Sequence, residues 1–388
     1  EMEESDWSSD VCSSDLRLFV DELKQVRIGL FTSDVWRSFA FTVAAGLLVF
    51  LYGRKKAGKV VLLAGIGALI LLDQWTVDKR YLNNDKDRGR YAHWVDDDEA
   101  KRPYKPNVAD KAILDAEWSP AADADHKATM EQLKKDGKLA VGKARAEEEI
   151  IERFSSLRRH GGYRVMTLNN PFADTKVSYF HRSLGGYHGA KLKRYQELIE
   201  FQLGPAIQRV GAMLQSGTSL PQMDSLLAKE GVLNMLNTRY LIYNPERPPI
   251  RNTNAYGPGW FVDEVRWVKS ADEEITEVGK IDPSTTALID EQYRPAMGAG
   301  KATADPSASV ELTKYATNEL TYTVRSQNGG VVVFSEIWYG PDWKATIDGK
   351  PADYARADYV LRAMTVPGGE HTVVFKVESA PYNTSKPV

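Results

Sequence analysis

The chain has 388 residues, of which 27% are charged, and a formal net charge of -3 at pH 7. This length gives room for two or three domains, and the slightly negative charge gives no basic face for nucleic acid. The six histidines have no close metal-ligand spacing, and neither a P-loop nor a dinucleotide fingerprint occurs. The sequence therefore predicts no metal site, no cofactor and no nucleic-acid partner.

The first residues look foreign to the protein. Residues 6–16 read DWSSDVCSSDL, which is the in-frame translation of a common sequencing-library adapter. We therefore expect residues 1–16 to be an assembly artefact and the protein to begin near Arg17, the alternative being an ordinary disordered terminus. The artefact would include Cys12, the only cysteine, so we expect no disulfide, no thiolate nucleophile and no thiolate metal site.

Two apolar stretches follow an amphipathic segment. Residues 17–33 space apolar side chains at helical period between charges, which is typical of an amphipathic helix that enters a membrane. Residues 38–52 and 60–72 are apolar on every face, and a bilayer core needs about 20 mostly apolar residues per helix. These stretches predict two transmembrane helices, with a buried helical hairpin of a soluble protein as the alternative.

A short basic loop predicts the topology of this hairpin. Residues 53–59 (GRKKAGK) carry four cations, and cytoplasmic loops of membrane proteins have an excess of Lys and Arg. We therefore expect residues 34–77, which begin at a helix cap formed by Ser33 and Asp34, to lie in a lipid bilayer. The loop would then be cytoplasmic, and the rest of the chain periplasmic or extracellular.

Residues 78–298 combine helical and strand patterns. Residues 96–99 (DDDE) indicate a solvated loop rather than a cation site, because no calcium-binding loop frames them. Helical spacing dominates residues 108–159, and strand patterns cover residues 163–168 and the end of residues 233–243. Two strands with helices between them predict a small external α/β module.

The hydrophobic period changes to two after residues 299–308, a linker by composition. Short strands follow within residues 309–380, separated by glycine-containing turns such as Asp348-Gly349, and this even spacing predicts an antiparallel β-sandwich. The predicted fold class is therefore α+β: a transmembrane helical hairpin, an external α/β module that also includes a strand-like run over 259–268, and a C-terminal β-sandwich. The expected strands of the sandwich are 309–314, 319–325, 331–337, 344–347, 359–365 and 370–377.

Four motifs resemble the YfhO family of bacterial membrane proteins, and in particular its members from Bacteroidetes. In chain order they are DVWRS at 34–38, GYHGAKLKRY at 186–195, LNTRY at 236–240, and SEIWYGPDWKATIDGK at 335–350 followed by VPGGEH at 366–371. The last motif contains the W-x-x-x-x-D-G and V-P-x-G-x-H signatures of the external β-domain of that family. The resemblance covers the chain from about Arg17 to its end.

The resemblance implies a polytopic protein of the bacterial inner membrane, similar to the C-type glycosyltransferases. Those enzymes use polyprenyl-phosphate-linked sugars, transfer the sugar at the outer membrane face to an envelope glycan or lipid, and keep their acidic catalytic residues in an early external loop. This sequence lacks those spans and the closing transmembrane helix, so we expect a C-terminal fragment with no catalytic residue of its own. The alternative is a membrane-anchored binding or assembly module without enzymatic activity.

Seven residues are candidate substrate-binding positions. Cations that follow the Gly185-Gly186 break near a helix start suit a phosphate of a lipid-linked donor. Imidazole is the side chain that most often serves as a general base, so the histidines suit that role, and aromatic rings on the β-domain suit stacking on sugars. A solvated helix face, satisfied loop histidines and packed aromatic rings are the structural alternatives. The positions are His181, Tyr187, His188, Lys191, Arg194, Trp338 and Trp343.

Overall fold

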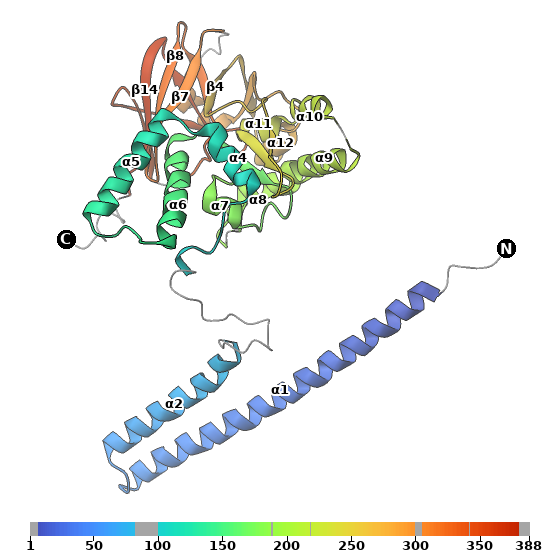
Figure 1. Ribbon diagram of the computed structural model, residues 1–388, viewed down its shortest axis with the longest axis vertical. Coiled ribbons are helices and arrows are strands. Elements are labelled where there is room, and N and C mark those ends of the chain that lie inside the picture. Colours follow the sequence, from blue (N-terminus) through green and yellow to red (C-terminus); the bar gives the residue numbers. More distant parts are fainter. Residues whose placement is uncertain are drawn as a thin grey trace, which may run out of the picture. The chain divides into compact units, whose positions relative to one another are not determined.

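The structure of this chain is a computed structural model with two long apolar helices followed by a mixed α/β region that contains several mostly antiparallel sheets (Figure 1). It divides into two compact units, Glu1–Lys101 and Arg102–Val388. It describes residues 7–81, 100–187, 189–217, 219–298, 305–340 and 342–379. His188, the acidic run 96–99 and residues 299–304 of the predicted linker lie outside this description.

Helices α1 and α2 form a hairpin in the first unit (Figure 1). α1 covers Trp7–Gly53 and α2 covers Lys59–Tyr81. Each contains a window that is long and apolar enough to cross a membrane, and none of the residues in these windows is buried. The two apolar helices are thus as predicted, but the separate amphipathic helix is not. Ser33 and Asp34 lie inside α1 rather than at a cap, because no proline interrupts the helical pattern there.

Charged side chains join the two helices at the ends of the apolar stretches farthest from the basic loop. Arg37 in α1 forms ion pairs with Asp34 at 3.2 Å and with Asp73 in α2 at 3.1 Å. Closer to the loop, a Cβ added to Gly65 would lie 2.8 Å from the side chain of Leu48. The ion pairs and this close approach together fix how α1 packs against α2.

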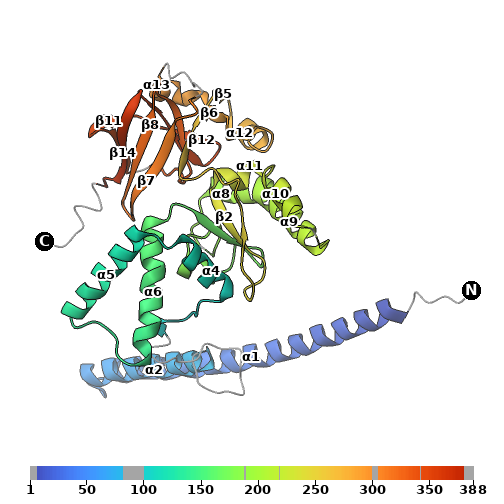
Figure 2. The same cartoon turned by 45° about the horizontal axis from the view of Figure 1, so that its top comes forward.

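The second unit begins with helices and a three-stranded sheet of order β1-β2-β3. β1 and β2 are parallel, and β3 is antiparallel to β2, so the two strands predicted in this region are present. Helices α5 and α6 pack side by side (Figure 2). The elements are α4 (Val108–Glu117), α5 (Pro120–Lys135), α6 (Lys143–His160), β1 (Arg164–Thr167), α7 (Lys176–Phe180), β2 (Thr238–Ile242) and β3 (Ile250–Arg251).

After α7, a run of short helices leads to β2. It consists of α8 (Lys193–Leu198), a π-helical turn η2 (Ile199–Leu203), α9 (Gly204–Gln215), α10 (Leu220–Leu227) and α11 (Gly231–Met235). Their apolar side chains share one hydrophobic cluster with β1, β2 and strands of the six-stranded sheet. The cluster includes Leu198 of α8, Leu241 of β2 and Val333 from the C-terminal region, so the helical and β-rich parts of this unit have a common core.

A five-stranded sheet with the order β11-β10-β14-β8-β7 is antiparallel throughout. Its strands are β7 (Ser309–Ala316), β8 (Glu319–Ser326), β10 (Trp343–Ile347), β11 (Lys350–Ala352) and β14 (Gly369–Val377). Asp348 and Gly349 join β10 to β11 with φ angles of 51° and 76°. Positive φ at both central positions is required by the tight hairpin turn that suits twisted strands, and the predicted turn at Asp348-Gly349 is confirmed.

A six-stranded sheet with the order β4-β9-β13-β12-β6-β5 takes strands from both sides of the predicted linker. Three of its strands precede residue 299, so the β-rich region begins at 259 rather than 309. The predicted run over 259–268 is two strands at opposite edges of this sheet, and Asp263 separates them. The strands are β4 (Gly259–Val262), β5 (Glu264–Val268), β6 (Thr286–Asp290), β9 (Gly330–Phe334), β12 (Ala355–Ala357) and β13 (Leu361–Val366). The remaining elements of this region are α12 (Ala271–Glu277), η3 (Glu291–Tyr293) and α13 (Arg294–Met297).

A second hydrophobic cluster takes side chains from both larger sheets. Tyr322 of β8, Phe334 of β9 and Phe375 of β14 form its aromatic centre, with the ring of Phe334 4.7 Å from that of Tyr322 and 5.1 Å from that of Phe375. Aromatic pairs at such distances add to the stabilisation from apolar burial. The cluster holds β9 in place, and the segment that follows β9 reaches the pocket described next.

Candidate functional site

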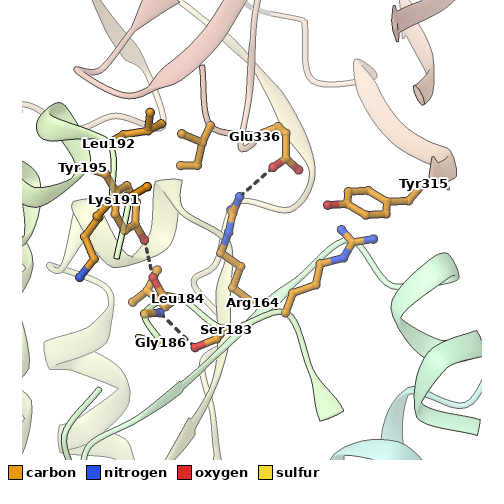
Figure 3. A pocket seen from close by; sticks show the side chains of 13 residues that line it. Arg164, Ser183, Leu184, Gly186, Lys191, Leu192, Tyr195, Tyr315 and Glu336 are labelled. Atoms are coloured by element: carbon orange, nitrogen blue, oxygen red, sulfur yellow. Dashed lines mark hydrogen bonds and ion pairs between the residues drawn. The ribbon is translucent and has the colours of Figure 1, made fainter. Parts of the chain in front are cut away.

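A pocket of about 410 Å³ lies in the second unit, where β1, the glycine loop before α8, β7 and the segment after β9 meet (Figure 3). Its volume is in the range of small-molecule sites. In Figure 3, Lys191, Leu192 and Tyr195 lie on one side, Tyr315 lies on the other, and Arg164 with Glu336 lies between them. The lining residues are Arg164, Arg182, Ser183, Leu184, Gly185, Gly186, Ala190, Lys191, Leu192, Tyr195, Tyr315, Glu336 and Ile337.

The predicted Gly185-Gly186 break forms one wall of the pocket. A Cβ on Gly185 would lie 1.9 Å from the carbonyl oxygen of Pro171, and Gly186 has a φ of +90°. The Gly186 N–H donates to the same Pro171 carbonyl at 2.9 Å. Only glycine fits both positions, because one leaves no space for a side chain and the other has a left-handed backbone.

Arg164, the first residue of β1, connects the three-stranded sheet to the segment after β9. Its guanidinium donates to the carbonyl oxygens of Leu236 at 2.8 Å and Ser335 at 2.6 Å. It also approaches the Glu336 carboxylate at 3.4 Å (Figure 3). These contacts hold Glu336 at the pocket and leave Arg164 with most of its donors engaged.

Arg182 stacks its guanidinium on the Tyr315 ring, 3.2 Å from the ring centre, and donates to the Arg158 carbonyl oxygen at 2.6 Å. Within the described chain its Nε is buried and has no hydrogen-bond partner. Burial lowers the pKa of Arg182, because desolvation disfavours the charged form. The Glu336 carboxylate and burial together raise the pKa of the Tyr315 phenol. Arg182 is therefore a cation whose charge is only partly compensated.

Lys191 and Tyr195 line the opposite side of the pocket, just before and within α8. The Lys191 ammonium lies 5.6 Å from the centre of the Phe172 ring, and among the described residues it forms no ion pair. The Tyr195 hydroxyl donates to the Leu184 carbonyl oxygen (Figure 3). Burial raises the pKa of Tyr195 to about 12, so the phenol stays protonated and keeps this loop in place at neutral pH.

The charges of the described lining residues are unbalanced, with three cations against one carboxylate. The carboxylate, Glu336, is the partner of Arg164, and no second carboxyl group lines this part of the pocket. Glycosidic chemistry commonly uses a pair of carboxylates as acid and base or nucleophile. The arrangement thus suits the binding of an anion beside aromatic and apolar surface rather than acid–base catalysis.

Of the predicted positions, the structure places Lys191 in the pocket and two others in structural ion pairs. The His181 Nε2 lies 3.2 Å from Asp110 Oδ1, and both side chains are buried. Arg194, next to Tyr195 in sequence, forms an ion pair of 3.0 Å with Glu274 and stacks on a tyrosine ring. In the structure these two side chains thus take part in ion pairs within the protein, and neither lines the pocket.

Of the remaining predicted positions, those that the structure describes do not line the pocket. Tyr187 is 72% exposed and lies beside the glycine loop, and His188 lies outside the described residues. Trp338 is half-buried, with Arg356 over its ring at 5.5 Å. Trp343 packs against the second hydrophobic cluster and has Arg362 over its ring at 4.3 Å. Both tryptophan rings are thus stacked with arginines of their own domain.

Sequence reasoning missed five charged or aromatic lining residues. They lie in segments whose patterns indicate ordinary strands, loops and a helix, so the sequence did not mark them as site residues. One signal was present: Arg164 and Arg182 are cations beside apolar and aromatic side chains in the short segments YRVMTL and SYFHRSL, and such residues need a partner when buried. The missed residues are Arg164, Arg182, Tyr195, Tyr315 and Glu336.

No protein-family model matches this chain, and no curated protein matches it. The resemblance to the YfhO family therefore rests on the four sequence motifs alone. Within the described part of the chain, no group of three or more His, Cys, Asp or Glu side chains is arranged to hold a metal ion.

Proposed function

We propose that this chain is the membrane-anchored, externally facing C-terminal part of a YfhO-like glycosyltransferase of the bacterial inner membrane. In this account the pocket holds a donor or acceptor saccharide during transfer from a polyprenyl-phosphate-linked sugar to an envelope glycan. The catalytic carboxylates belong to further membrane spans of the longer protein. The two larger sheets pack face to face as a β-sandwich that carries one wall of the pocket.

The observation that carries the proposal is the cationic pocket beside the GYHGAKLKRY motif. Gly186, Ala190, Lys191, Leu192 and Tyr195 all come from this motif and all line the pocket. A motif that resembles the family thus coincides with a small-molecule-sized pocket. Pockets at the junction of two structural parts are common ligand sites, and an excess of cations suits a substrate that carries phosphate.

The apolar hairpin supports the membrane part of the proposal. Both windows are unburied, and exposed apolar side chains include Trp36, Phe39, Phe50 and Leu71. A contiguous apolar surface of this kind needs an apolar partner. A lipid bilayer supplies that partner, with the basic loop on the cytoplasmic side.

A membrane-anchored binding module without enzymatic activity is the second candidate function. It is favoured by the composition of the pocket, because its described lining offers one carboxylate, already paired with Arg164, and no second acid. In this alternative the same pocket holds a saccharide for assembly rather than for transfer.

The experiment that tests the proposal is a transfer assay in membrane vesicles with a labelled polyprenyl-phosphate sugar. The longer protein is expected to transfer label to envelope glycan, and this chain alone is expected to transfer none. Sugar transfer by this chain alone would contradict the assignment of the catalytic carboxylates to other spans of the longer protein. A longer protein that binds sugar but transfers none would establish the binding module instead.

A further inference from the structure

We propose that the pocket recognises the oxyanion of an acidic saccharide, a phosphate or a carboxylate attached to a sugar ring, and that Lys191 and Arg182 select it. This inference deepens the proposed function and rests on it in assuming that a saccharide is the ligand. It goes beyond the proposed function because it specifies which chemical group of the ligand is recognised and which residues recognise it.

The charge of the site requires an anion. Among the described lining residues there is one carboxylate, that of Glu336, and it pairs with Arg164 at 3.4 Å, whereas Arg182 forms no ion pair with a described residue. Lys191, on the other side of the pocket, has no ion pair among the described residues. Cations that are partly desolvated and unpaired are costly, so a ligand that brings negative charge into this volume is favoured over a neutral one.

Arg182 and Lys191 have more hydrogen-bond donors than their partners in the described chain use. Arg182 uses one donor on the Arg158 carbonyl, while its stacking on Tyr315 fixes the plane of the guanidinium. A fixed guanidinium plane suits the geometry of carboxylate and phosphate oxygens. Lys191 has a flexible stem and three donors, so it can follow an oxyanion at different depths in the pocket.

The rest of the lining suits the ring of a sugar. Tyr315 and Tyr195 contribute aromatic surface, while Leu184, Leu192 and Ile337 contribute aliphatic surface. Sugar rings present C–H faces that pack on such surfaces, with hydroxyl groups at the edge for polar partners. The volume of about 410 Å³ suits a ligand of one or two sugar rings rather than a bare inorganic ion.

The test is a titration of the full chain in detergent micelles with three probes: mannose 1-phosphate, glucuronic acid and glucose. Dissociation constants are read from ligand-observed nuclear magnetic resonance. At least one of the two anionic probes is expected to bind about tenfold or more tighter than glucose. Binding of the phosphate alone would identify a lipid-linked donor as the source of the oxyanion, and binding of the carboxylate alone would identify an acidic glycan.

Matched variants assign the recognition to the pocket. Lys191→Gln is expected to weaken anion binding about tenfold. Lys193→Gln, two residues away, is expected to change it less than about twofold, because Lys193 lies outside the lining and pairs with Glu197 at 3.6 Å. Glu336→Gln removes the one carboxylate among the described lining residues and is expected to tighten anion binding about fivefold, a gain that misfolding cannot produce.

Three results would overturn the inference: glucose binding as tightly as both anions, Lys191→Gln and Lys193→Gln having equal effects, or Glu336→Gln weakening the binding of a folded protein. Each of these is measured on this chain alone and without sugar transfer. The inference therefore fails or stands independently of the transfer assay, in which the longer protein tests the proposed enzymatic role.

Discussion

Several residues of the four YfhO-like motifs link one secondary-structure element to another. Asp348 in the β10–β11 turn pairs with His371 near the start of β14, with 2.7 Å between Oδ2 and Nδ1, and Asp348 Oδ1 accepts from the Thr372 N–H at 2.8 Å. The W-x-x-x-x-D-G and V-P-x-G-x-H signatures thus meet in space and stabilise one end of the five-stranded sheet. Arg239 of LNTRY pairs with Glu117 at 2.9 Å and joins β2 to α4.

Asp358 is a fully buried acid with an unusual backbone. Its Oδ1 accepts from the Leu288 N–H at 2.8 Å, its Oδ2 has no hydrogen-bond partner in the described chain, and its φ is +48°. Burial, with a further contribution from the neighbouring Glu274 carboxylate, raises the pKa of Asp358 to about 8. The folded protein therefore keeps this proton over a pH range in which the unfolded chain, with a carboxyl pKa of 3.8, has lost it.

We predict that Asp358→Asn stabilises the protein near pH 8 and has little effect near pH 4. Because the folded pKa is raised, the contribution of Asp358 is most favourable below its unfolded pKa and declines as pH rises towards about 8. Asparagine is neutral at every pH and tolerates positive φ. Thermal unfolding at several pH values is expected to show a gain on the order of 2 kcal/mol at the alkaline end. An equal effect at both ends would contradict the raised pKa.

At the scale of elements, the loop 183–186 shapes the pocket. We predict that Gly185→Ala destabilises the second unit by about 2 kcal/mol or more, because the new Cβ would lie 1.9 Å from the Pro171 carbonyl oxygen. Gly189→Ala is the matched control, since nothing lies within 4 Å of its Cβ. Denaturant unfolding of both variants measures the difference, and equal stabilities would show that the loop can move.

Much of the secondary structure is predictable from local patterns. Strands β7, β8 and β14, the Asp348-Gly349 turn and the two strands β1 and β2 follow from alternation, turn residues and short apolar runs. The joint six-stranded sheet was not predictable, because β4 pairs with β9, from Gly259 opposite Phe334 to Val262 opposite Val331. Such pairing depends on contacts between distant segments, which local periodicity does not record.

The candidate site was predictable only in part for the same reason. Lys191 and the glycine pair lie close together in the sequence and can be recognised there. Arg164, Tyr315 and Glu336 come from three separate segments, and only folding brings them together in the pocket. Arg194 and Tyr195 show the limit most clearly. They are adjacent in sequence, yet Arg194 pairs with Glu274 and Tyr195 lines the pocket, because neighbouring side chains on a helix point in different directions.

At the scale of the whole molecule, an external pocket requires that the hairpin cross a bilayer. Residues 38–52 and 60–72 span about 20 Å each at 1.5 Å per residue, so the flanking polar residues must extend into the interfacial region. The Arg37–Asp73 ion pair then lies near the outer end of the apolar segments. A soluble protein with a buried hairpin would instead need other protein to cover these apolar side chains.

The most direct test of this central claim is thiol labelling in intact cells with a membrane-impermeant reagent, in a Cys12→Ser background. Lys56→Cys is placed in the basic loop, and Ser307→Cys is placed before β7. We expect that only the Ser307→Cys variant is labelled until the cells are permeabilised. Protection of both positions in intact cells, or labelling of Lys56→Cys alone, would contradict an external pocket anchored by a membrane hairpin.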